Sequence, residues 1–432
     1  MNVLRHTEPG FDARLRELTR TSSLFDSAIE DRARAIIEAV QTRGDAALLE
    51  FTERFDGVRL EADQLAVTTA EILEASLSAD SSLRAALAVA SKNIELFSRK
   101  SLRREWSARN GQGAKVGEKF DAFERIGIYV PGGTAPLMST CLMTILLARV
   151  ARCREIVVCT PCDAIGGIHP GLLFAARAAG ATEIYRLGGA QAIAAMALGT
   201  ATVRPVQKIF GPGNGYVVAA KRLLFGRVAI DLLPGPSEVL VLADHSANAR
   251  FAAADLLAQA EHGSGHERVW LVTTSSRIIE NVRKQIAKQL PRLSRRVFIE
   301  RALSKNGWLI QVANLATAIE LVNRLAPEHC EIMTKTPAKV GKQITTAGAI
   351  FLGAWSPTVL GDYVAGPSHT LPTGGAGASF AGLTVDQFQR RTSIVEYNKV
   401  SLARSLGAVR KFAEIEGLDA HGRSADIRLE AP

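Results

Sequence analysis

The first hundred residues carry apolar positions at the three- and four-residue spacing that is typical of helices. Such patterns run over about 27–43, 45–55 and 81–101, whereas residues 1–25 are polar and show little periodicity. We therefore predict an N-terminal arm followed by a helical scaffold. The last helix places these apolar residues on one face: Leu83, Leu87, Ala90, Ile94 and Phe97.

From Arg125 to Leu233 the pattern changes to short apolar runs that alternate with alanine-rich helical stretches. Five strands separated by four helices of this length are typical of a parallel sheet with crossover helices. The expected strands are Ile126–Val130, Glu155–Thr160, Glu183–Leu187, Lys208–Phe210 and Val228–Leu233.

The same alternation resumes after the turn Pro234-Gly235-Pro236. The two stretches together predict an α/β fold of two incomplete Rossmann-like lobes with parallel sheets. Ligands of such folds bind near the carboxyl ends of the strands, so we expect a cleft between the lobes. The further strands are Glu238–Ala243, Arg268–Thr274, a run near Ile310–Ala313, Cys330–Thr334 and Ala349–Gly353.

The C-terminal part begins with the segment Gly374–Gly382, which is too glycine-rich for a core and is expected to be a hinge or a ligand loop. A helix over about 401–416, stopped by Gly417, and a short tail with His421 follow. A small helical arm of this kind cannot bury a core of its own, so it must pack on another body.

The composition is that of a well-packed protein of two or three domains, with 432 residues of which 47% are hydrophobic. Five cysteines are an odd number, which fits a reducing cytoplasm better than a disulfide framework. The N-terminus lacks the apolar run of a signal peptide, and Arg149 and three hydroxyl residues interrupt the apolar stretch 135–150. We expect a cytoplasmic protein that does not enter a membrane.

The formal charge of +9, from 52 basic and 43 acidic residues, raises the question of nucleic-acid binding. The basic residues are scattered, however, and aromatic residues make up only 6% of the chain. Pairs such as Arg103-Arg104 and Arg390-Arg391 are typical of solvated faces. The charge therefore favours small anionic ligands at most, and we expect no nucleic-acid partner.

Two glycine-rich loops follow expected strands in the first lobe, at 131–134 and 211–215. Gly211-Pro-Gly-Asn-Gly215 precedes a helix, where backbone N–H groups can meet a pyrophosphate, and Asp231 follows Gly211 by twenty residues. The pattern is not the full dinucleotide fingerprint, so a tight structural turn is the alternative. Together the two loops make this lobe a plausible nucleotide-binding lobe.

Cysteine and histidine pairs were weighed as metal or redox motifs. Cys159 and Cys162 form a lone C-x-x-C, which favours two small buried residues over a redox pair. His262 and His266 lack the adjacent Glu of a zinc-protease helix, and two glycines separate them. His266 is therefore interpreted as a loop residue.

Gln259 and His262 lie three residues apart at the end of an expected helix, so they share a face that can bind a metal. Asp362, in a loop rich in Gly and Pro, is either a turn former or the missing oxygen ligand. His421 is either a surface residue or a further nitrogen ligand.

Pro327-Glu328-His329 places a carboxylate beside an imidazole at a probable strand start. Adjacent strand residues usually point apart, which gives an exposed Glu next to a half-buried His. A functional interpretation needs an irregular backbone that turns both side chains toward the cleft. His329 then suits accepting a hydroxyl proton, and a partly buried Glu328 suits activating water.

Seven blocks, in order across nearly the whole chain, resemble the histidinol dehydrogenase family. They are Arg125–Pro136, Gly211–Gly215, Gly235–Glu238, Gln259–His262, Leu325–His329, Leu360–Tyr363 and Arg391–Tyr397. The resemblance implies an intertwined homodimer with shared active sites. It also implies oxidation of L-histidinol to L-histidine through histidinaldehyde, with two NAD per turnover.

The resemblance also implies roles for single residues. It gives the catalytic pair as Glu328 for water activation and His329 for acid/base steps, and NAD contacts as Tyr129, Gln191 and Asn214. It gives the ligands of a Zn²⁺ ion as Gln259, His262, Asp362 and, from the partner's arm, His421. Substrate contacts comprise the same four metal ligands together with Ser237, His329, His369 and Glu416.

The expected domains follow from this assignment. They are an N-terminal arm (1–25), a zinc and substrate lobe (26–128 with 238–382), an NAD lobe (129–237) and a C-terminal arm that reaches the partner subunit (383–432). Two departures from the family pattern, Pro234 and the glycine-rich loop 263–266, affect no ligand. Cys330, next to the catalytic pair, is interpreted as a small buried residue rather than a thiol nucleophile.

Two other functions remain as alternatives. One is a related zinc and NAD dehydrogenase that acts on another small alcohol, which substrate profiling separates from the first. The other is a non-catalytic binding protein, which predicts salt-dependent nucleic-acid binding and no loss on replacing Glu328.

Overall fold

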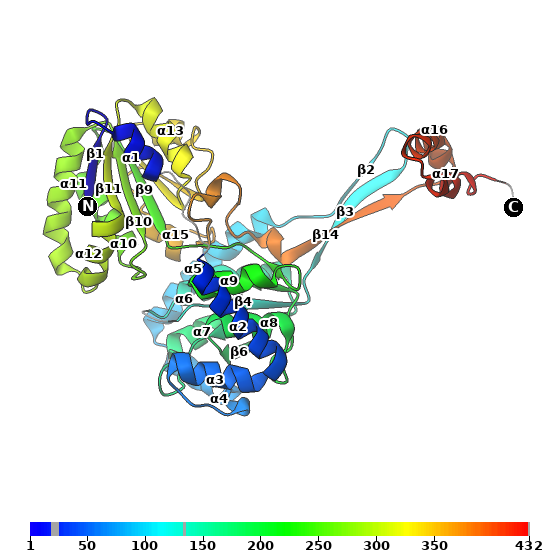
Figure 1. The fold of residues 1–432 in the computed structure, drawn as a ribbon, viewed down its shortest axis with the longest axis horizontal. Coiled ribbons are helices and arrows are strands. Elements are labelled where there is room, and N and C mark those ends of the chain that lie inside the picture. The colour runs from blue at the N-terminus through cyan, green and yellow to red at the C-terminus, as the bar shows by residue number, and fades with distance from the viewer. Residues whose placement is uncertain (19–25, 133–134, 431–432) are drawn as a thin grey trace.

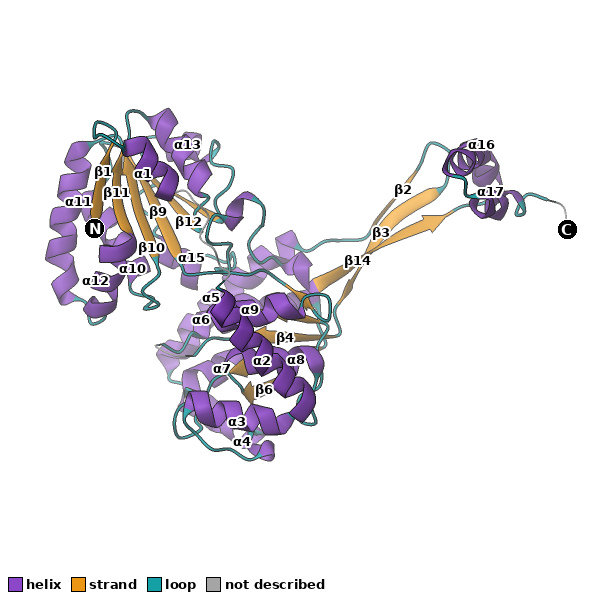
Figure 2. Cartoon of the chain, viewed as in Figure 1, coloured by secondary structure: helices purple, strands orange, loops and turns teal. Residues whose placement is uncertain are grey.

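The chain forms two α/β lobes and a long arm that projects from between them (Figures 1 and 2). The structure is a computed structural model, and it describes residues 1–18, 26–132 and 135–430. Both lobes are built on parallel sheets, which confirms the predicted fold class. The second glycine loop, at 131–134, lies partly outside the described residues.

The first sheet has five parallel strands in the order β6-β5-β4-β7-β8. Short apolar runs form these strands because both faces are covered by helices. The strands are β4 (Arg125–Tyr129), β5 (Glu155–Thr160), β6 (Glu183–Arg186), β7 (Lys208–Phe210) and β8 (Ala229–Ile230). The crossover helices are α6 (Met138–Ala151), α7 (Pro170–Ala179), α8 (Gly189–Leu198) and α9 (Gly215–Leu224).

The second sheet has six parallel strands in the order β1-β11-β10-β9-β12-β13. Its strands are β1 (Asn2–Arg5), β9 (Glu238–Ala243), β10 (Arg268–Thr273), β11 (Gly307–Gln311), β12 (His329–Met333) and β13 (Ala349–Leu352). Its helices are α1 (Phe11–Leu18), α10 (Ala249–Ala260), α11 (Ser276–Gln289), α12 (Arg296–Asn306), α13 (Leu315–Leu325), α14 (Pro337–Gly341) and α15 (Thr358–Tyr363).

The N-terminal residues differ from the expected separate arm. β1 adds an edge strand beside β11, with Asn2 opposite Trp308. α1 places Phe11 and Leu15 against the core of the same sheet. Pairing with a strand three hundred residues away leaves no local periodicity by which β1 could be predicted.

The helices of 27–101 pack on the crossover helices of the five-stranded lobe, whereas the predicted division groups 26–128 with 238–382. Their apolar faces join the cores of that lobe, where Ile36 shares a buried cluster with Val157 and Ile94 shares one with Ile128. Helical periodicity reports that a face is buried but not which sheet covers it. The helices are α2 (Ser27–Arg43), α3 (Asp45–Asp56), α4 (Thr69–Ser78) and α5 (Ser81–Ser101).

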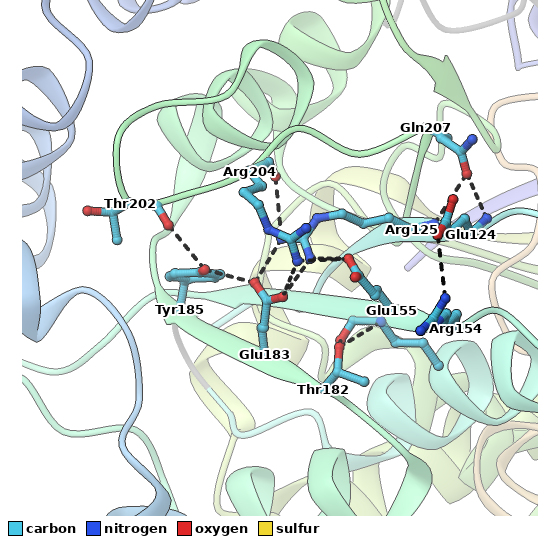
Figure 3. Close-up of polar contacts among 11 residues, drawn as sticks. Glu124, Arg125, Arg154, Glu155, Thr182, Glu183, Tyr185, Thr202, Arg204 and Gln207 are labelled. Carbon is cyan, nitrogen blue, oxygen red and sulfur yellow. Dashed lines mark hydrogen bonds and ion pairs between the residues drawn. The ribbon is translucent and has the colours of Figure 1, made fainter.

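An ion-pair network ties together the amino ends of β4, β5 and β6 (Figure 3). The buried guanidinium of Arg125 lies 2.7 Å from Glu155 and donates to Glu183 at 2.8 Å. The Arg125 hydrogen bonds lower the pKa of Glu183 to about 2. This edge is opposite the carboxyl ends of the strands. The network therefore stabilises the sheet and does not occupy the edge at which ligands of such folds bind.

The projecting arm is a three-stranded antiparallel ribbon with two helices at its tip (Figure 1). Both segments 106–122 and 389–396 contribute strands that the sequence analysis did not predict. All four residues of the first strand are exposed, so they show no alternation of buried positions. The elements are β2 (Trp106–Arg109), β3 (Lys115–Ala122), β14 (Gln389–Glu396), α16 (Lys399–Glu416) and α17 (Asp419–Asp426).

Candidate active site

Glu328 and His329 are both buried, at 6% and 3% exposed, where β12 begins. Ala326, just before them, has φ of 46°, a left-handed conformation that is uncommon for residues other than glycine. It ends α13, and Pro327 follows. The backbone before Glu328 and His329 is therefore irregular. A functional role for these two residues depends on such an irregular backbone, because adjacent strand residues otherwise point apart.

The ring of His329 is held in one tautomer. Its Nδ1–H donates to the Glu238 carbonyl at 2.9 Å, so Nε2 carries the lone pair. Nε2 lies 3.7 Å from an Asp362 carboxylate oxygen. Burial lowers the pKa of His329, with Asp362 opposing, and the neutral ring can accept a proton at Nε2.

Glu328 is buried beside a second buried carboxyl, that of Glu238. Its Oε2 accepts the Glu238 N–H at 2.7 Å, and burial raises the pKa of Glu328 well above its ordinary value. Glu238 is 1% exposed and accepts the Gly374 N–H at 3.0 Å. Burial raises the pKa of Glu238 to about 7, with Arg268 opposing from 3.5 Å.

Glu238 is a site residue that the sequence analysis missed as such. It was quoted only as the first residue of a strand and within the block Gly235–Glu238. An acidic residue at the start of an otherwise apolar central strand was the available signal. Its partner Glu328 is ninety residues away in sequence, so no spacing links them.

Asp362 and His369 meet His329 from the loop side of the site. The Nδ1–H of His369 donates to the Asp362 carbonyl at 3.1 Å, and its Nε2 lies 3.3 Å from the buried Thr140 hydroxyl. Asp362 itself is on α15, and one of its carboxylate oxygens lies 4.0 Å from the same Nδ1. Burial lowers the pKa of His369, with Asp362 opposing.

Gln259 and His262 end the α10 region as predicted, although the helix itself stops at Ala260. Gln259 is 1% exposed, and its amide nitrogen has no hydrogen-bond partner among the described residues. His262 is exposed in the following turn, and its Nδ1–H donates to the Gln259 carbonyl at 3.0 Å. Its charge lowers the pKa of both His329 and His369, so it lies at the same site.

Glu416 and His421 lie away from this cluster, on α16 and α17 at the tip of the arm (Figure 1). Both are exposed. Within the described chain, no three His, Cys, Asp or Glu side chains are close enough to hold a metal ion. One chain thus brings Gln259, His262 and Asp362 to one region and does not bring His421.

The three residues expected to contact NAD lie at the carboxyl edge of the five-stranded sheet. The hydroxyl of Tyr129, at the end of β4, accepts the Gly189 N–H at 3.0 Å. Asn214 caps α9 by accepting the Tyr216 N–H at 3.0 Å. Gln191 is buried with neither side-chain polar atom bonded in the described residues, and it lines a cavity of about 660 Å³ with Phe51 and Tyr216.

Asp231 does not serve as the ribose-binding acid of a dinucleotide fingerprint. Its side chain is fully buried and paired with Lys221, and it accepts the Gly211 N–H at 2.8 Å. Lys221 also donates to the Gly211 carbonyl at 3.0 Å and to the Leu232 carbonyl at 2.8 Å. The loop 211–214 is therefore anchored through both polar groups of Gly211.

The structure also places Ser237 and the cysteines. Ser237 is partly exposed just before β9, and its carbonyl accepts the Arg268 N–H at 3.0 Å. Cys159 is fully buried as predicted, whereas Cys162 is only partly buried, and neither forms a disulfide in the described residues. Cys330 is fully buried too, and burial raises the pKa of its thiol to about 12, which disfavours a nucleophilic thiolate.

Comparisons with known proteins give one consistent answer. The family model for histidinol dehydrogenase matches residues 19–429. The histidinol dehydrogenase of Synechococcus sp. is 44% identical over 402 residues, which cover 93% of this chain and 92% of the relative. That of Bradyrhizobium diazoefficiens is 44% identical over 427 residues, which cover 99% and 98%.

A solved structure agrees with these sequences. The crystal structure of histidinol dehydrogenase from Elizabethkingia anophelis matches with a TM-score of 0.94 at 35% identity, covering 99% of this chain and 98% of that one. No helix within the described residues is long and apolar enough to cross a membrane. The chain belongs to the histidinol dehydrogenase family of oxidoreductases.

Proposed function

We propose that this protein oxidises L-histidinol to L-histidine through histidinaldehyde, with Zn²⁺ and two molecules of NAD per turnover, in histidine biosynthesis. The observation that carries the proposal is the buried pair Glu328 and His329 beside Asp362 and His262. Family membership supplies histidinol as the substrate class. The free, mostly buried cysteines support a reducing, cytoplasmic location.

The residues present fit a zinc ion. The Nδ1–H of His262 is taken by a backbone carbonyl, which leaves Nε2 as the donor atom, the arrangement of a zinc-ligating histidine. Gln259 is buried with an unpartnered amide, so its side chain is free to turn an oxygen to a cation. With Asp362 and the partner's His421 these would hold the metal, which supplies positive charge that positions the imidazole and amine of the substrate.

His329 acts on the hydroxyl proton in the first oxidation. Its Nε2 is unprotonated in the neutral ring and lies near the Asp362 carboxylate on α15. Taking the alcohol proton there allows the carbon-bound hydrogen to leave as hydride. When bound, NAD would supply the hydride acceptor, one molecule for each of the two oxidations.

Glu328 prepares the second oxidation by activating water. A carboxyl whose pKa is raised by burial is a stronger base than an exposed glutamate, so it can take a proton from water near neutral pH. The resulting hydroxyl adds to the aldehyde carbon, and His329 takes the proton of the hydrate. Glu238 holds both groups in place, through its N–H to Glu328 and its carbonyl to His329.

The arm supports a homodimer with shared sites. Glu416 and His421 lie on a ribbon tip that leaves its own lobes, and exposed apolar residues such as Phe412 and Ile415 have no cover in the single chain. A second copy can supply that cover and receive the two polar residues. The proposed site then contains His421 of the partner subunit.

The Tyr129, Gln191 and Asn214 positions support NAD binding on the five-stranded lobe. Gln191 is the strongest of the three, because two unbonded polar atoms facing a cavity indicate a missing ligand. Asn214 stands at the start of α9, where backbone N–H groups attract phosphate.

Metal analysis combined with a histidinol and NAD assay, before and after chelation, tests the proposal. We expect bound zinc, two NADH per histidinol, and activity that is lost on chelation and restored by Zn²⁺. One NADH per alcohol, or faster turnover of an alcohol without an imidazole, would favour a related dehydrogenase instead. Activity that survives complete metal removal would contradict the zinc assignment.

A further inference from the structure

Two buried carboxyls lie beside the active site without belonging to it. Glu331, on β12, is 1% exposed, and Asp255, on α10, is 8% exposed. Alternate residues of a strand point to the same face, so Glu331 lies on the face of His329. Met333 on that face packs in the core that α10 covers. Glu331 therefore lies on the face of the six-stranded sheet that α10 covers, and Asp255 is a buried residue of that helix.

The oxygens of Glu331 have different surroundings. Oε1 accepts the Thr358 N–H, the first of α15, at 2.6 Å. Oε2 is buried and accepts no hydrogen bond from any described residue. Asp255 is the acidic side chain that acts on the Glu331 carboxyl, and each of the two groups shifts the pKa of the other. Two neighbouring buried carboxyls can form a hydrogen bond only when one of them holds a proton, and a proton on Oε2 would make this oxygen the donor.

The proton belongs on Glu331. Burial raises the pKa of both carboxyls, and the Asp255 charge raises that of Glu331 further, whereas the hydrogen bond from Glu331 opposes the rise in Asp255. The groups that face Glu331 are Asp255 from α10 and the Thr358 N–H from α15. Its register neighbours on β9 and β13 are the apolar Val241 and Phe351.

Asp255, Thr358 and Glu331 are each close in sequence to a site residue on the same helix or strand. Asp255 precedes Gln259 by one helical turn, and Thr358 precedes Asp362 by the same interval. Glu331 follows His329 by two residues on β12. The Asp255–Glu331 pair thus links α10, β12 and α15 close to the site residues that these elements carry.

We propose that Asp255 and Glu331 form a proton-sharing carboxyl pair that positions α10, β12 and α15, and with them the zinc ligands Gln259, His262 and Asp362. The inference rests on the zinc site of the proposed function. It assigns positioning roles to two residues that touch neither metal nor substrate. A linked hydrogen bond to each helix fixes the distance between ligands that come from separate elements.

The shared proton gives the pair a pH dependence of known sign. The folded protein holds a proton that an exposed glutamate releases below neutral pH, so the pair stabilises the fold most at low pH. That stability is lost as the pH rises through the raised pKa of Glu331, because two buried negative charges then repel.

The test compares Glu331→Gln, Glu331→Leu and Asp255→Asn with Glu320→Gln, an exposed control. A glutamine donates to Asp255 and accepts the Thr358 N–H without a titrating proton, whereas a leucine does neither. Zinc affinity is measured with Zn²⁺ alone, by competition with a chromogenic chelator, at about pH 7 and about pH 9. Thermal unfolding of the metal-free variants at both values checks the fold.

We expect Glu331→Gln and Asp255→Asn to bind zinc within about twofold of wild type at pH 7, and Glu331→Leu to bind at least about tenfold more weakly. From pH 7 to 9, both amide variants should gain zinc affinity relative to wild type, and their unfolding temperature should fall less. Unchanged zinc affinity in a folded Glu331→Leu protein overturns the positioning role. Amide variants as weak as the leucine variant, or with wild-type pH dependence, overturn the shared proton.

Failure of the proposed function gives a different result. A wild-type protein that binds no zinc removes the zinc site itself, while the unfolding temperatures of the metal-free variants still report on the shared proton. If Glu331→Leu does not fold, the change of zinc affinity between pH 7 and pH 9 in the two amide variants decides whether the carboxyl pair positions the zinc ligands.

Discussion

Glu328 and His329 owe their different chemistry to the groups around each side chain. His329 is kept neutral with its lone pair at Nε2, because burial lowers its pKa and Glu238 takes its Nδ1–H. Burial raises the pKa of Glu328, and the hydrogen bond from the Glu238 N–H opposes that rise. Two adjacent residues at the start of β12 therefore suit two successive proton transfers.

Replacing Glu328 with Gln should separate the two oxidation steps. The amide keeps the size of the side chain but cannot take a proton from water. We expect alcohol oxidation within about tenfold of wild type and oxidation of supplied histidinaldehyde slowed by about 10²–10⁴-fold. Rapid-mixing assays of each step, with zinc content as the control, check this. Equal loss in both steps would contradict the assigned role.

The two steps should also respond differently to pH. As the pH falls, Glu328 protonates at a higher pH than an ordinary glutamate, about 4.3, so aldehyde oxidation fails early. His329 stays unprotonated below the ordinary histidine value, about 6.5, so alcohol oxidation persists. Single-turnover rates of both steps across this range measure the two acid limbs. An acid limb for aldehyde oxidation near 4.3 would exclude Glu328 as the base.

The sequence alone pointed to candidate site residues more directly than to the groups around them. Motifs and family resemblance pointed to Glu328, His329, Gln259 and His262, which the structure gathers with Asp362. The sequence could not reveal Glu238, whose N–H and carbonyl act on residues about ninety positions away. Nor could it reveal the αL conformation of Ala326, because alanine carries no sign of a left-handed turn.

At the scale of single elements, the loop 211–214 is fixed by a buried ion pair rather than by its glycines alone. Gly211 has φ of 109°, and a Cβ there would lie 2.1 Å from the Tyr129 carbonyl oxygen, so no other residue fits. Lys221 and Asp231 then hold its carbonyl and its N–H. This geometry sets the position of Asn214 and the start of α9.

Removing one partner of that ion pair should destabilise the first lobe. Lys221→Met leaves the Asp231 carboxylate buried without its cation, which costs about 3–5 kcal/mol of unfolding free energy. The double variant Lys221→Met/Asp231→Asn should recover part of that loss. Urea unfolding measures both, with the exposed Lys284→Met as control. Equal stability of the single variant and wild type would refute the cost of the unpaired charge.

Most strands and helices were predictable, and the reasons for the exceptions are physical. Apolar runs and helical periods mark elements that bury a face, which is why the ten central strands were found. The ribbon buries little in the single chain, so β2 and β14 lacked that signal. The helices α2–α5 were found, but their period does not specify the sheet on which they pack.

At the scale of the whole molecule, the arm separates residues that the proposed chemistry needs together. Glu416 and His421 are exposed at its tip, and Gln259 and Asp362 are in the six-stranded lobe. The family resemblance predicted exchange of arms between subunits.

Mixing two inactive variants tests the shared site. His262→Ala and His421→Ala should each lose zinc and activity when pure. After subunit exchange, half of the dimers are mixed, and one of their two sites is intact, so about a quarter of the sites should recover. Zinc content and activity of the mixture measure this, with either variant alone as control. No recovery despite proven exchange would place His421 outside the partner's site.

The edge position of β1 also has a consequence for biosynthesis. Residues 2–5 are translated three hundred residues before their neighbour at 308–311. At about 5–20 residues per second, this strand waits roughly 15 to 60 s for its hydrogen-bonding partner. The nascent chain must therefore keep an unpaired β-edge from aggregating until the second lobe has almost been translated.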